Sequence, residues 1–307
     1  MFMFKYSLDN KRYHTLNYHY KKKYGKKTCK ISLNANFSCP NKKDGQGCIF
    51  CSRLGSGDFA GDVAKGLVTQ FNDVKKIMER KWPDSYYIGY FQANTNTYAP
   101  LPVLKEKYET ILSLPNVVGL DIATRSDAIS KEVLDYLEEL NQKTNLTIEL
   151  GLQSIHKKTL ELIHRGHTLE NFEYMVKELQ KRNIEVVVHI INGLPYETKE
   201  DMIETVKYLN KLKIDGIKIH MLYIVENTAL YDLYSENQFT LLKKEEYVDI
   251  VISQLEYLDP KIVIHRITGD PKQEDLLEPQ WLVKKRSLIN DIDKEMVKRD
   301  SYQGKKC

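Results

Sequence analysis

Residues 34–61, NANFSCPNKKDGQGCIFCSRLGSGDFAG, hold three of the five cysteines in this chain of 307 residues. Cys39, Cys48 and Cys51 stand in a C-x8-C-x2-C spacing, and Phe50 directly precedes the last of them. The same loop contains Gly45, Gly47, Gly55 and Gly57. Such a loop buries little apolar surface, but its backbone can fold tightly around an object and it concentrates soft ligands. The stretch therefore predicts a metal site for which the rest of the chain is a scaffold.

Strand-like and helix-like segments alternate around this loop. Strands are predicted at 28–33, 86–92, 117–123, 146–153, 184–191 and 216–225, and helices at 62–81, 104–114, 131–142, 156–164, 169–183 and 199–212. Six strand–helix units indicate a parallel sheet with right-handed crossovers, and the near-continuous apolar strands indicate that both faces are covered. No G-x-G-x-x-G follows the first strand. The predicted fold is therefore α/β, a partial (β/α)6 TIM-like barrel rather than an open doubly wound sheet.

The C-terminal part of the chain follows a different pattern. It predicts a helix at 243–258, a strand at 261–267 and a basic helix at 280–298. No internal repeat or low-complexity linker separates these elements from the barrel. We therefore expect a basic, aromatic N-terminal segment at 1–27, a partial barrel at 28–225, and a C-terminal α/β extension of the same domain at 226–307.

The cysteine loop lies just beyond the C-terminal end of the first predicted strand, on the face where α/β barrels build active sites. Three thiolates can hold three irons of a [4Fe–4S] cluster and leave the fourth iron open. A closed zinc site would need a fourth ligand, for which Cys29 is the only nearby cysteine. Five residues of strand place Cys29 roughly 16 Å from the loop. An open site made by three cysteines is therefore preferred, and Cys307 is an end-of-chain thiol.

The overall composition excludes several other classes of protein. The chain is 42% hydrophobic and 29% charged, and its longest apolar stretches, such as 186–191, are too short to span a membrane. Its charged, aromatic N-terminus does not resemble a signal peptide. An odd number of cysteines gathered in one loop does not fit a secreted disulfide framework. We expect a cytoplasmic protein without membrane contact.

Positive charge is concentrated at the N-terminus. Residues 1–30 contain nine Lys or Arg against one acid, Asp9, and five tyrosines are interleaved with them. Cations bind phosphates and aromatic rings stack on bases, so the segment predicts a contact with nucleic acid. The alternative is a solvated basic segment that packs its tyrosines on the barrel.

Taken together, these features resemble the radical S-adenosylmethionine superfamily. The gap of eight residues between the first two cysteines is similar to its long-gap branch, which includes the Elongator catalytic-subunit-like enzymes. The chain is also similar to a small bacterial group near that branch, with a C-terminal extension, that is implicated in maturing wobble uridine in tRNA. Matching segments are ATRSD at 123–127, ELGLQS at 149–154, IHRGHT at 163–168 and NGLPYET at 192–198. The resemblance covers residues 28–225.

The resemblance implies two cofactors, a [4Fe–4S] cluster and S-adenosylmethionine. Cys39, Cys48 and Cys51 would bind three irons, and the amine and carboxylate of S-adenosylmethionine would bind the fourth. One electron, from a donor of the flavodoxin or ferredoxin type, would release a 5′-deoxyadenosyl radical that abstracts a hydrogen from the substrate. The cofactors supply this chemistry, and the protein supplies position and electrostatics.

The same resemblance implies several contacts with S-adenosylmethionine. Glu149 would bind the ribose hydroxyls and Gln153 would lie near the ligand; Gln92 would lie near the methionyl group, and Phe50 beside the cluster. On the residues alone, Glu149 and Gln153 share one face of a strand, and a buried polar network without ligand explains them as well. Gly193 would allow the adenine a close approach, or form a plain strand-to-helix turn.

Arginine and histidine side chains supply the remaining candidates. Arg125 can clamp a carboxylate of the cofactor or the substrate, and is a candidate catalytic residue, unless a salt bridge with Asp121 or Asp127 occupies it. Arg165 is a second carboxylate ligand candidate. His220, on the strand face of Lys218, is the other catalytic candidate, although a lone strand histidine is more often structural.

The sequence therefore predicts a radical S-adenosylmethionine enzyme that acts on tRNA and is held by the basic N-terminal segment and the basic C-terminal helix. By resemblance alone, the reaction would convert carboxymethylaminomethyl-uridine to aminomethyl-uridine. The alternatives are the same chemistry on a protein or small molecule, and a zinc-stabilised RNA-binding module.

Overall fold

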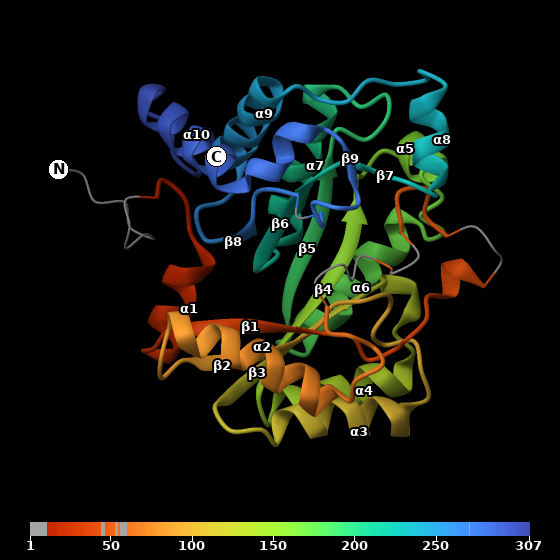
Figure 1. Ribbon diagram of the computed structural model, residues 1–307, viewed down its shortest axis with the longest axis vertical. Helices are drawn as coiled ribbons and strands as arrows, with labels where there is room; N and C mark the ends of the chain where they lie inside the picture. The colour runs from red at the N-terminus through yellow and green to blue at the C-terminus, as the bar shows by residue number, and fades with distance from the viewer. Residues whose placement is uncertain (1–10, 44–46, 53–54, 56–59, 270) are drawn as a thin grey trace.

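The computed structural model describes residues 11–43, 47–52, 55, 60–269 and 271–307. A parallel sheet of seven strands, in the order β1-β2-β3-β4-β5-β6-β8, forms its centre. The strands are β1 (Thr28–Leu33), β2 (Tyr86–Phe91), β3 (Val117–Thr124), β4 (Asn145–Gln153), β5 (Glu185–Asn192), β6 (Gly216–Met221) and β8 (Val263–Arg266). The sheet curls into a partial barrel with β1 and β8 at its edges (Figure 1). The predicted fold class is confirmed.

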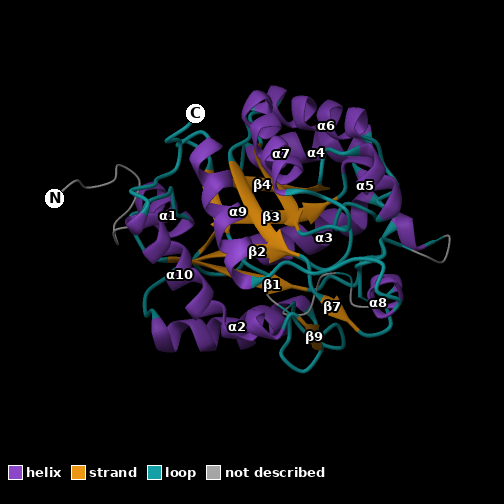
Figure 2. Cartoon of the chain, turned by 90° about the horizontal axis from the view of Figure 1, so that it is seen from above, coloured by secondary structure: helices purple, strands orange, loops and turns teal. Residues whose placement is uncertain are grey.

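Helices follow the strands and cover the outer face of the sheet (Figure 2). They are α1 (Leu16–Tyr24), α2 (Leu67–Lys81), α3 (Leu101–Leu112), α4 (Lys131–Asn141), α5 (Lys157–Leu162), α6 (Leu169–Lys181), α7 (Lys199–Leu212), α8 (Ala229–Ser235), α9 (Lys244–Tyr257) and α10 (Lys285–Lys298), with 3-10 turns η1 (Pro40–Lys42), η2 (Ser126–Ala128) and η3 (Gln280–Lys284). The predicted caps are present: Ser130, Thr168 and Thr198 each accept a hydrogen bond from the backbone at the third helical residue. None of the described helices has the length and apolar character that crossing a membrane requires.

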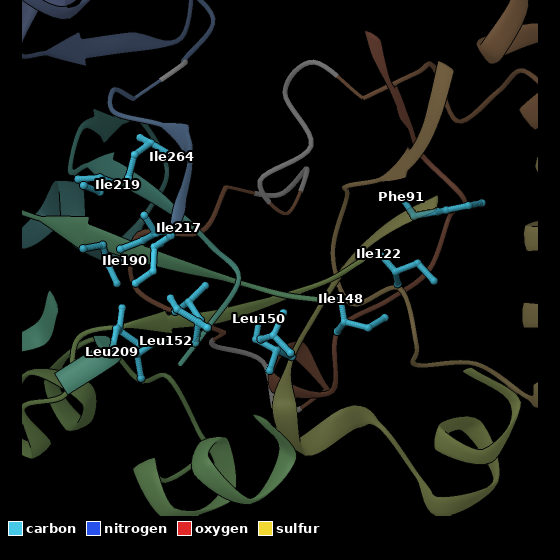
Figure 3. Close-up of a cluster of buried hydrophobic side chains, with 14 of the residues drawn as sticks. Phe91, Ile122, Ile148, Leu150, Leu152, Ile190, Leu209, Ile217, Ile219 and Ile264 are labelled. Carbon is cyan, nitrogen blue, oxygen red and sulfur yellow. The ribbon is translucent and has the colours of Figure 1, made fainter. Parts of the chain in front are cut away.

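The outer face of the sheet forms the hydrophobic core with these helices. Leu150, Leu152 and Ile190 are at most 1% exposed, and Figure 3 shows them among the apolar side chains that line these strands. Residues that alternate with them, such as Glu149 and His189, face the inside of the barrel. The inside of the barrel is therefore polar where the outside is apolar.

The N-terminal segment closes the barrel at the end where the strands begin. Thr15 forms a β-bridge with Ile264 of β8, and α1 packs against both edge strands. Tyr20 is buried, and its Oη donates a hydrogen bond to Asp121 Oδ2 on β3 at 3.4 Å. Since β1 starts just after α1 and the cysteine loop follows its far end, α1 and that loop lie at opposite ends of the barrel (Figures 1 and 2). Tyrosines thus pack on the barrel, as the alternative for this segment proposed.

The C-terminal extension is continuous with the barrel, because β8 pairs with β6 in the same sheet. Helix α9 packs on α7, and α10 packs on α9. The backbone N–H of Gln303 donates to Arg12 O at 2.9 Å, so the two ends of the described chain lie side by side (Figure 1). The division at residues 27 and 225 stays a prediction, and residues 1–10 of the N-terminal segment lie outside the described part.

Three predicted elements differ most from those in the structure. The helix predicted at 62–81 begins only at Leu67, because Asp62 forms a turn with the following backbone N–H groups and Val63 is 49% exposed. The strand predicted at 216–225 is split: β6 ends at Met221, and β7 (Ile224–Val225) pairs with β9 (Leu276–Glu278) in a separate antiparallel sheet. The helix predicted at 280–298 is η3 followed by α10.

Candidate functional site

A cavity of about 230 Å³ opens at the C-terminal end of the barrel strands. All three cysteines of the loop, Cys39, Cys48 and Cys51, line it. So do six further predicted site residues, Phe50, Gln92, Arg125, Glu149, Gln153 and Arg165, together with His220. Of the predicted residues, Gly193 alone is not among those that line it. The adenine contact of Gly193 stays a prediction; its φ is +83°, and a Cβ there would lie 3.0 Å from Leu242 Cδ1.

The cysteine loop is held by a turn that lies far away in the sequence. Three consecutive carbonyl oxygens, those of Ile163, His164 and Arg165, accept hydrogen bonds from Ile49 N at 3.2 Å, Asn41 Nδ2 at 2.7 Å and Arg125 Nη1 at 2.7 Å. Ile49 is 5% exposed and packs with Ile163 in a small apolar cluster. The segment IHRGHT thus anchors the loop and one arginine of the cavity.

Gly166 allows this close approach. Its φ is +83°, and a Cβ built there would lie 2.2 Å from Asn41 Oδ1. A left-handed backbone and a side-chain neighbour at that distance both require glycine. Asn41 Nδ2 in turn lies 3.4 Å from Cys48 Sγ. The turn is therefore packed against the loop at the position of the second cysteine.

The three thiols are close enough to influence one another. Burial, together with Cys51 and Cys39, raises the pKa of the Cys48 thiol to about 12, although Arg125 acts in the opposite direction. Three crowded thiols ionise together only when a cation binds them, which is the chemistry of a metal or cluster site. Cys29 is buried near the start of β1, beside Tyr87 of β2, and does not line the cavity. The donor set fits a cluster with three cysteine ligands and one open iron.

Two arginines of the cavity wall donate hydrogen bonds within the protein, although Arg165 Nε has no partner among the described residues. Arg125 Nε and Nη2 donate to the two carboxylate oxygens of Asp127 at 2.9 and 2.8 Å. This is the salt bridge that was the alternative to a contact between Arg125 and a carboxylate of the cofactor or substrate. Arg165 is 1% exposed and donates to Leu152 O at 3.1 Å and His167 O at 2.7 Å. Arg165 therefore fixes the end of β4 to the IHRGHT turn.

Glu149 is the centre of a buried charged layer inside the barrel. Its Oε1 accepts from Lys30 Nζ at 2.9 Å, and its Oε2 accepts from His189 Nε2 at 2.8 Å and Lys218 Nζ at 2.5 Å. Lys30 also forms an ion pair with Asp121. Burial alone would raise the pKa of Glu149, but the ammonium groups of Lys218 and Lys30 hold it well below its usual range. This is the polar network that was the alternative to a ribose contact.

Lys218 and His220 lie on the same face of β6 as successive inward positions. Lys218 is 4% exposed, and burial, with Lys30 and Arg266 nearby, lowers its pKa to about 7 against the opposing effect of Glu149. The Nε2 atom of His220 is buried without a hydrogen-bond partner in the described structure.

Sequence reasoning missed the layer as a unit. Its members come from six different strands: Lys30, Tyr90, Asp121, Glu149, His189 and Lys218. The available signal was one polar or charged residue in the middle of each apolar strand. Only the strand register shows that these residues meet.

The sequence matches the model of the radical SAM superfamily over residues 38–209 and that of the Radical_SAM C-terminal domain over residues 214–298. It is 47% identical to the uncharacterised protein YtqA of Bacillus subtilis over 98% of this chain and 95% of that one. It is 30% identical to the tRNA uridine(34) acetyltransferase of Methanocaldococcus infernus, over 59% of this chain but only 34% of that protein.

The fold is also similar to a solved structure, the archaeal Methanocaldococcus infernus Elp3, with a TM-score of 0.68 and 17% identity over 90% of this chain and 64% of that one. At that identity the likeness concerns the fold. The sequence match covers more than half of the chain, and it excludes the alternative of a zinc-stabilised binding module. The chain belongs to the radical SAM superfamily, and it is an enzyme that uses a [4Fe–4S] cluster and S-adenosylmethionine.

Proposed function

We propose that this enzyme modifies tRNA by maturing the side chain on wobble uridine, from carboxymethylaminomethyl-uridine to aminomethyl-uridine. One observation carries the tRNA assignment: over 59% of its length the chain is 30% identical to a protein named for tRNA uridine 34. That relative is named as an acetyltransferase, and this chain spans a third of its length. The specific reaction therefore follows from the resemblance to the small bacterial group, and from a cavity whose inner wall is charged.

The residues of the loop would hold the cluster. Cys39, Cys48 and Cys51 line one cavity and would bind three irons, while the carbonyls of Ile163 and His164 hold the loop in place. When bound, the reduced cluster and S-adenosylmethionine supply a 5′-deoxyadenosyl radical as the hydrogen-abstracting species. The hydrogen would come from the glycine-derived methylene of the uridine side chain. An electron donor of the flavodoxin or ferredoxin type, and the cytoplasm as compartment, complete the proposal.

Contacts to S-adenosylmethionine are proposed for the remaining lining residues. Phe50 lies in the cysteine loop, and Gln92 and Gln153 lie at the C-terminal ends of β2 and β4. All three line the cavity together with the cysteines. Arg125 is held by Asp127 and contributes positive charge beside the thiols. A ribose contact of Glu149 would add to the three hydrogen bonds that its oxygens already accept.

The RNA-binding surface is proposed to include α1. Lys21 and Lys22 are exposed, and the described residues form no ion pair with either of them. Helix α10 contributes less positive charge than expected, because the acids Asp291, Asp293 and Glu295 stand among its lysines and arginine. Both segments lie near the termini, away from the cysteine loop (Figure 1). A tRNA bound there must extend along the molecule to reach the cavity.

Nucleoside mass spectrometry of tRNA from a strain that lacks this gene tests the function. Carboxymethylaminomethyl-uridine should accumulate and its aminomethyl derivative should be lost. An unchanged profile would overturn the tRNA proposal and favour a protein or small-molecule substrate.

Two substitutions on α1 test the RNA-binding surface. The pair Lys21→Glu and Lys22→Glu should weaken tRNA binding and reduce its salt dependence. The matched pair Lys177→Glu and Lys181→Glu on α6 should not.

A further inference from the structure

The cavity has two levels along the barrel. The cysteines line the outer level, beyond the strand ends, and Tyr90, Glu149, His189 and Lys218 line the inner level from within their strands. We call these four residues the floor. On β6, Lys218 precedes His220 by two residues, which is a rise of about 6.6 Å along a strand. The floor therefore lies below the outer level, and a side chain that enters past the cysteines would reach it.

Lys218 has a donor to spare. Its Nζ donates to Tyr90 Oη at 3.0 Å and to Glu149 Oε2 at 2.5 Å. In its protonated form it carries three N–H donors, so one then remains without a partner in the described part of the chain. A buried charged donor left unpaired is costly, and an incoming acceptor would remove that cost.

His220 offers a second atom in the same place. Its Nε2 is buried and unpartnered, and its ring lies 5.1 Å from that of His189. Burial and the neighbouring His189 keep the pKa of His220 well below its usual range, so the imidazole is neutral and can donate one hydrogen bond. Both side chains project from one face of β6 into the cavity.

The charges of the layer indicate what kind of group fits there. Its two carboxylates, Asp121 and Glu149, are already engaged by lysines, and Arg266 also lines the cavity. A cation would face Lys218 and Arg266, whereas an anion would accept from Lys218 and His220. We propose that Lys218 and His220 form a subsite for the carboxylate of the substrate side chain. The proposal rests on the proposed function, in which that group is the carboxymethyl end of the uridine substituent.

Equilibrium binding to the reconstituted enzyme with S-adenosylmethionine, but without reductant, tests the subsite. The probes are the nucleosides 5-carboxymethylaminomethyl-uridine and 5-aminomethyl-uridine, which differ by the carboxymethyl group. The wild type should prefer the first roughly 10- to 100-fold, as expected for a hydrogen-bonded charged group. Lys218→Met should abolish most of this preference. His220→Phe, which breaks no hydrogen bond within the described protein, should reduce it several-fold.

Lys30→Met is the matched control. Lys30 pairs with Glu149 as Lys218 does, but it does not line the cavity. This variant should perturb the same network and keep the preference for the carboxylate. Equal loss in Lys30→Met and Lys218→Met would overturn the subsite.

The carboxylate of S-adenosylmethionine offers the same chemistry, so the affinity for S-adenosylmethionine is measured in parallel. If Lys218→Met lowered that affinity and left the nucleoside preference intact, the subsite would belong to the cofactor and the proposal would be wrong. A wild type without preference would also overturn it. If the tRNA assignment is wrong, the nucleoside profile of the deletion strain will be unchanged. That result does not depend on the Lys218 or His220 variants, so it can be told apart from failure of the subsite.

Discussion

Replacing Glu149 by Gln tests whether this residue holds the barrel interior together. The substitution keeps the shape of the side chain and removes the charge that Lys30, His189 and Lys218 share. Removal of one partner of a buried ion pair costs about 3–5 kcal/mol. Lys30 keeps Asp121, and Lys218, with a pKa of about 7, can release its proton. We therefore expect the free energy of unfolding to fall by about 3 kcal/mol at pH 7, at the lower end of that range.

The pH dependence of this loss identifies Lys218 as the partner. In the wild type Lys218 is protonated below pH 7 and paired with Glu149. In Glu149→Gln its folded pKa falls further, so the variant binds fewer protons in the folded state and loses more stability as the pH falls. The difference should grow by up to about 1.4 kcal/mol per pH unit between pH 7 and pH 6, and become constant above pH 8.

Urea unfolding of the cluster-free protein, followed by circular dichroism, measures these differences. A double-mutant cycle with Lys218→Met should show a coupling of about 1–3 kcal/mol, because the two residues are in contact. Asp73→Asn, which breaks the exposed pair with Lys65, is the control and should change little. A loss under 1 kcal/mol in Glu149→Gln, without pH dependence, would refute the reasoning. If that variant instead lost only affinity for S-adenosylmethionine, Glu149 would be a ribose ligand.

Three further predictions concern the loop and its support. Cys48→Ala should lose the iron and the brown colour after anaerobic reconstitution, whereas Cys29→Ala should keep both, as iron analysis and absorption spectra will show. Gly166→Ala should lower the free energy of unfolding by about 1–3 kcal/mol and lower iron retention, because its φ is positive and its Cβ would overlap a neighbouring side chain. Gly66→Ala, which faces open space, should be tolerated in the same urea and iron assays. Burial and nearby arginines lower the pKa of His167 to about 3. The stability that this neutral histidine contributes is fully present above pH 6.5. It should be lost as the pH falls toward 3, by an amount on the order of 3 kcal/mol. In His167→Gln the loss of stability over the same pH range should be smaller.

The fold was predictable because its main signals are local. Apolar strand runs and helix caps such as Thr198 lie within a few residues of the elements that they define. Strand β8 has only four residues, and its place beside β6 depends on pairing across the whole extension, which no local pattern reports. The break after Met221 was missed for the same reason, since β7 pairs with a strand more than fifty residues later.

The cysteines of the site were also predictable, because their spacing is itself the signal. Their support was not: the carbonyls of Ile163 and His164 contact the loop across more than a hundred residues of sequence, and a carbonyl group carries no side-chain signature. Arg165 illustrates the difficulty. Its charge predicts a carboxylate contact, which stays a prediction; Nη1 and Nη2 tie the turn to β4 through backbone carbonyls, which no sequence pattern reports, and Nε is buried without a partner among the described residues.

The charged layer is harder to explain by stability than by function. Lys30, Asp121, Glu149 and Lys218 occupy barrel positions where apolar side chains would pack without desolvating charge. Replacement of buried ion pairs by apolar residues is often neutral or stabilising, so such a layer is weak evidence for stability. Polar groups that break the local pattern tend to mark functional sites. Glu149 and Lys218 of the layer line the same cavity as the cysteines, and donors on Lys218 and on the neighbouring His220 face that space. A layer kept only for structure would pair those donors internally, and it is their lack of partners that favours a ligand at the floor.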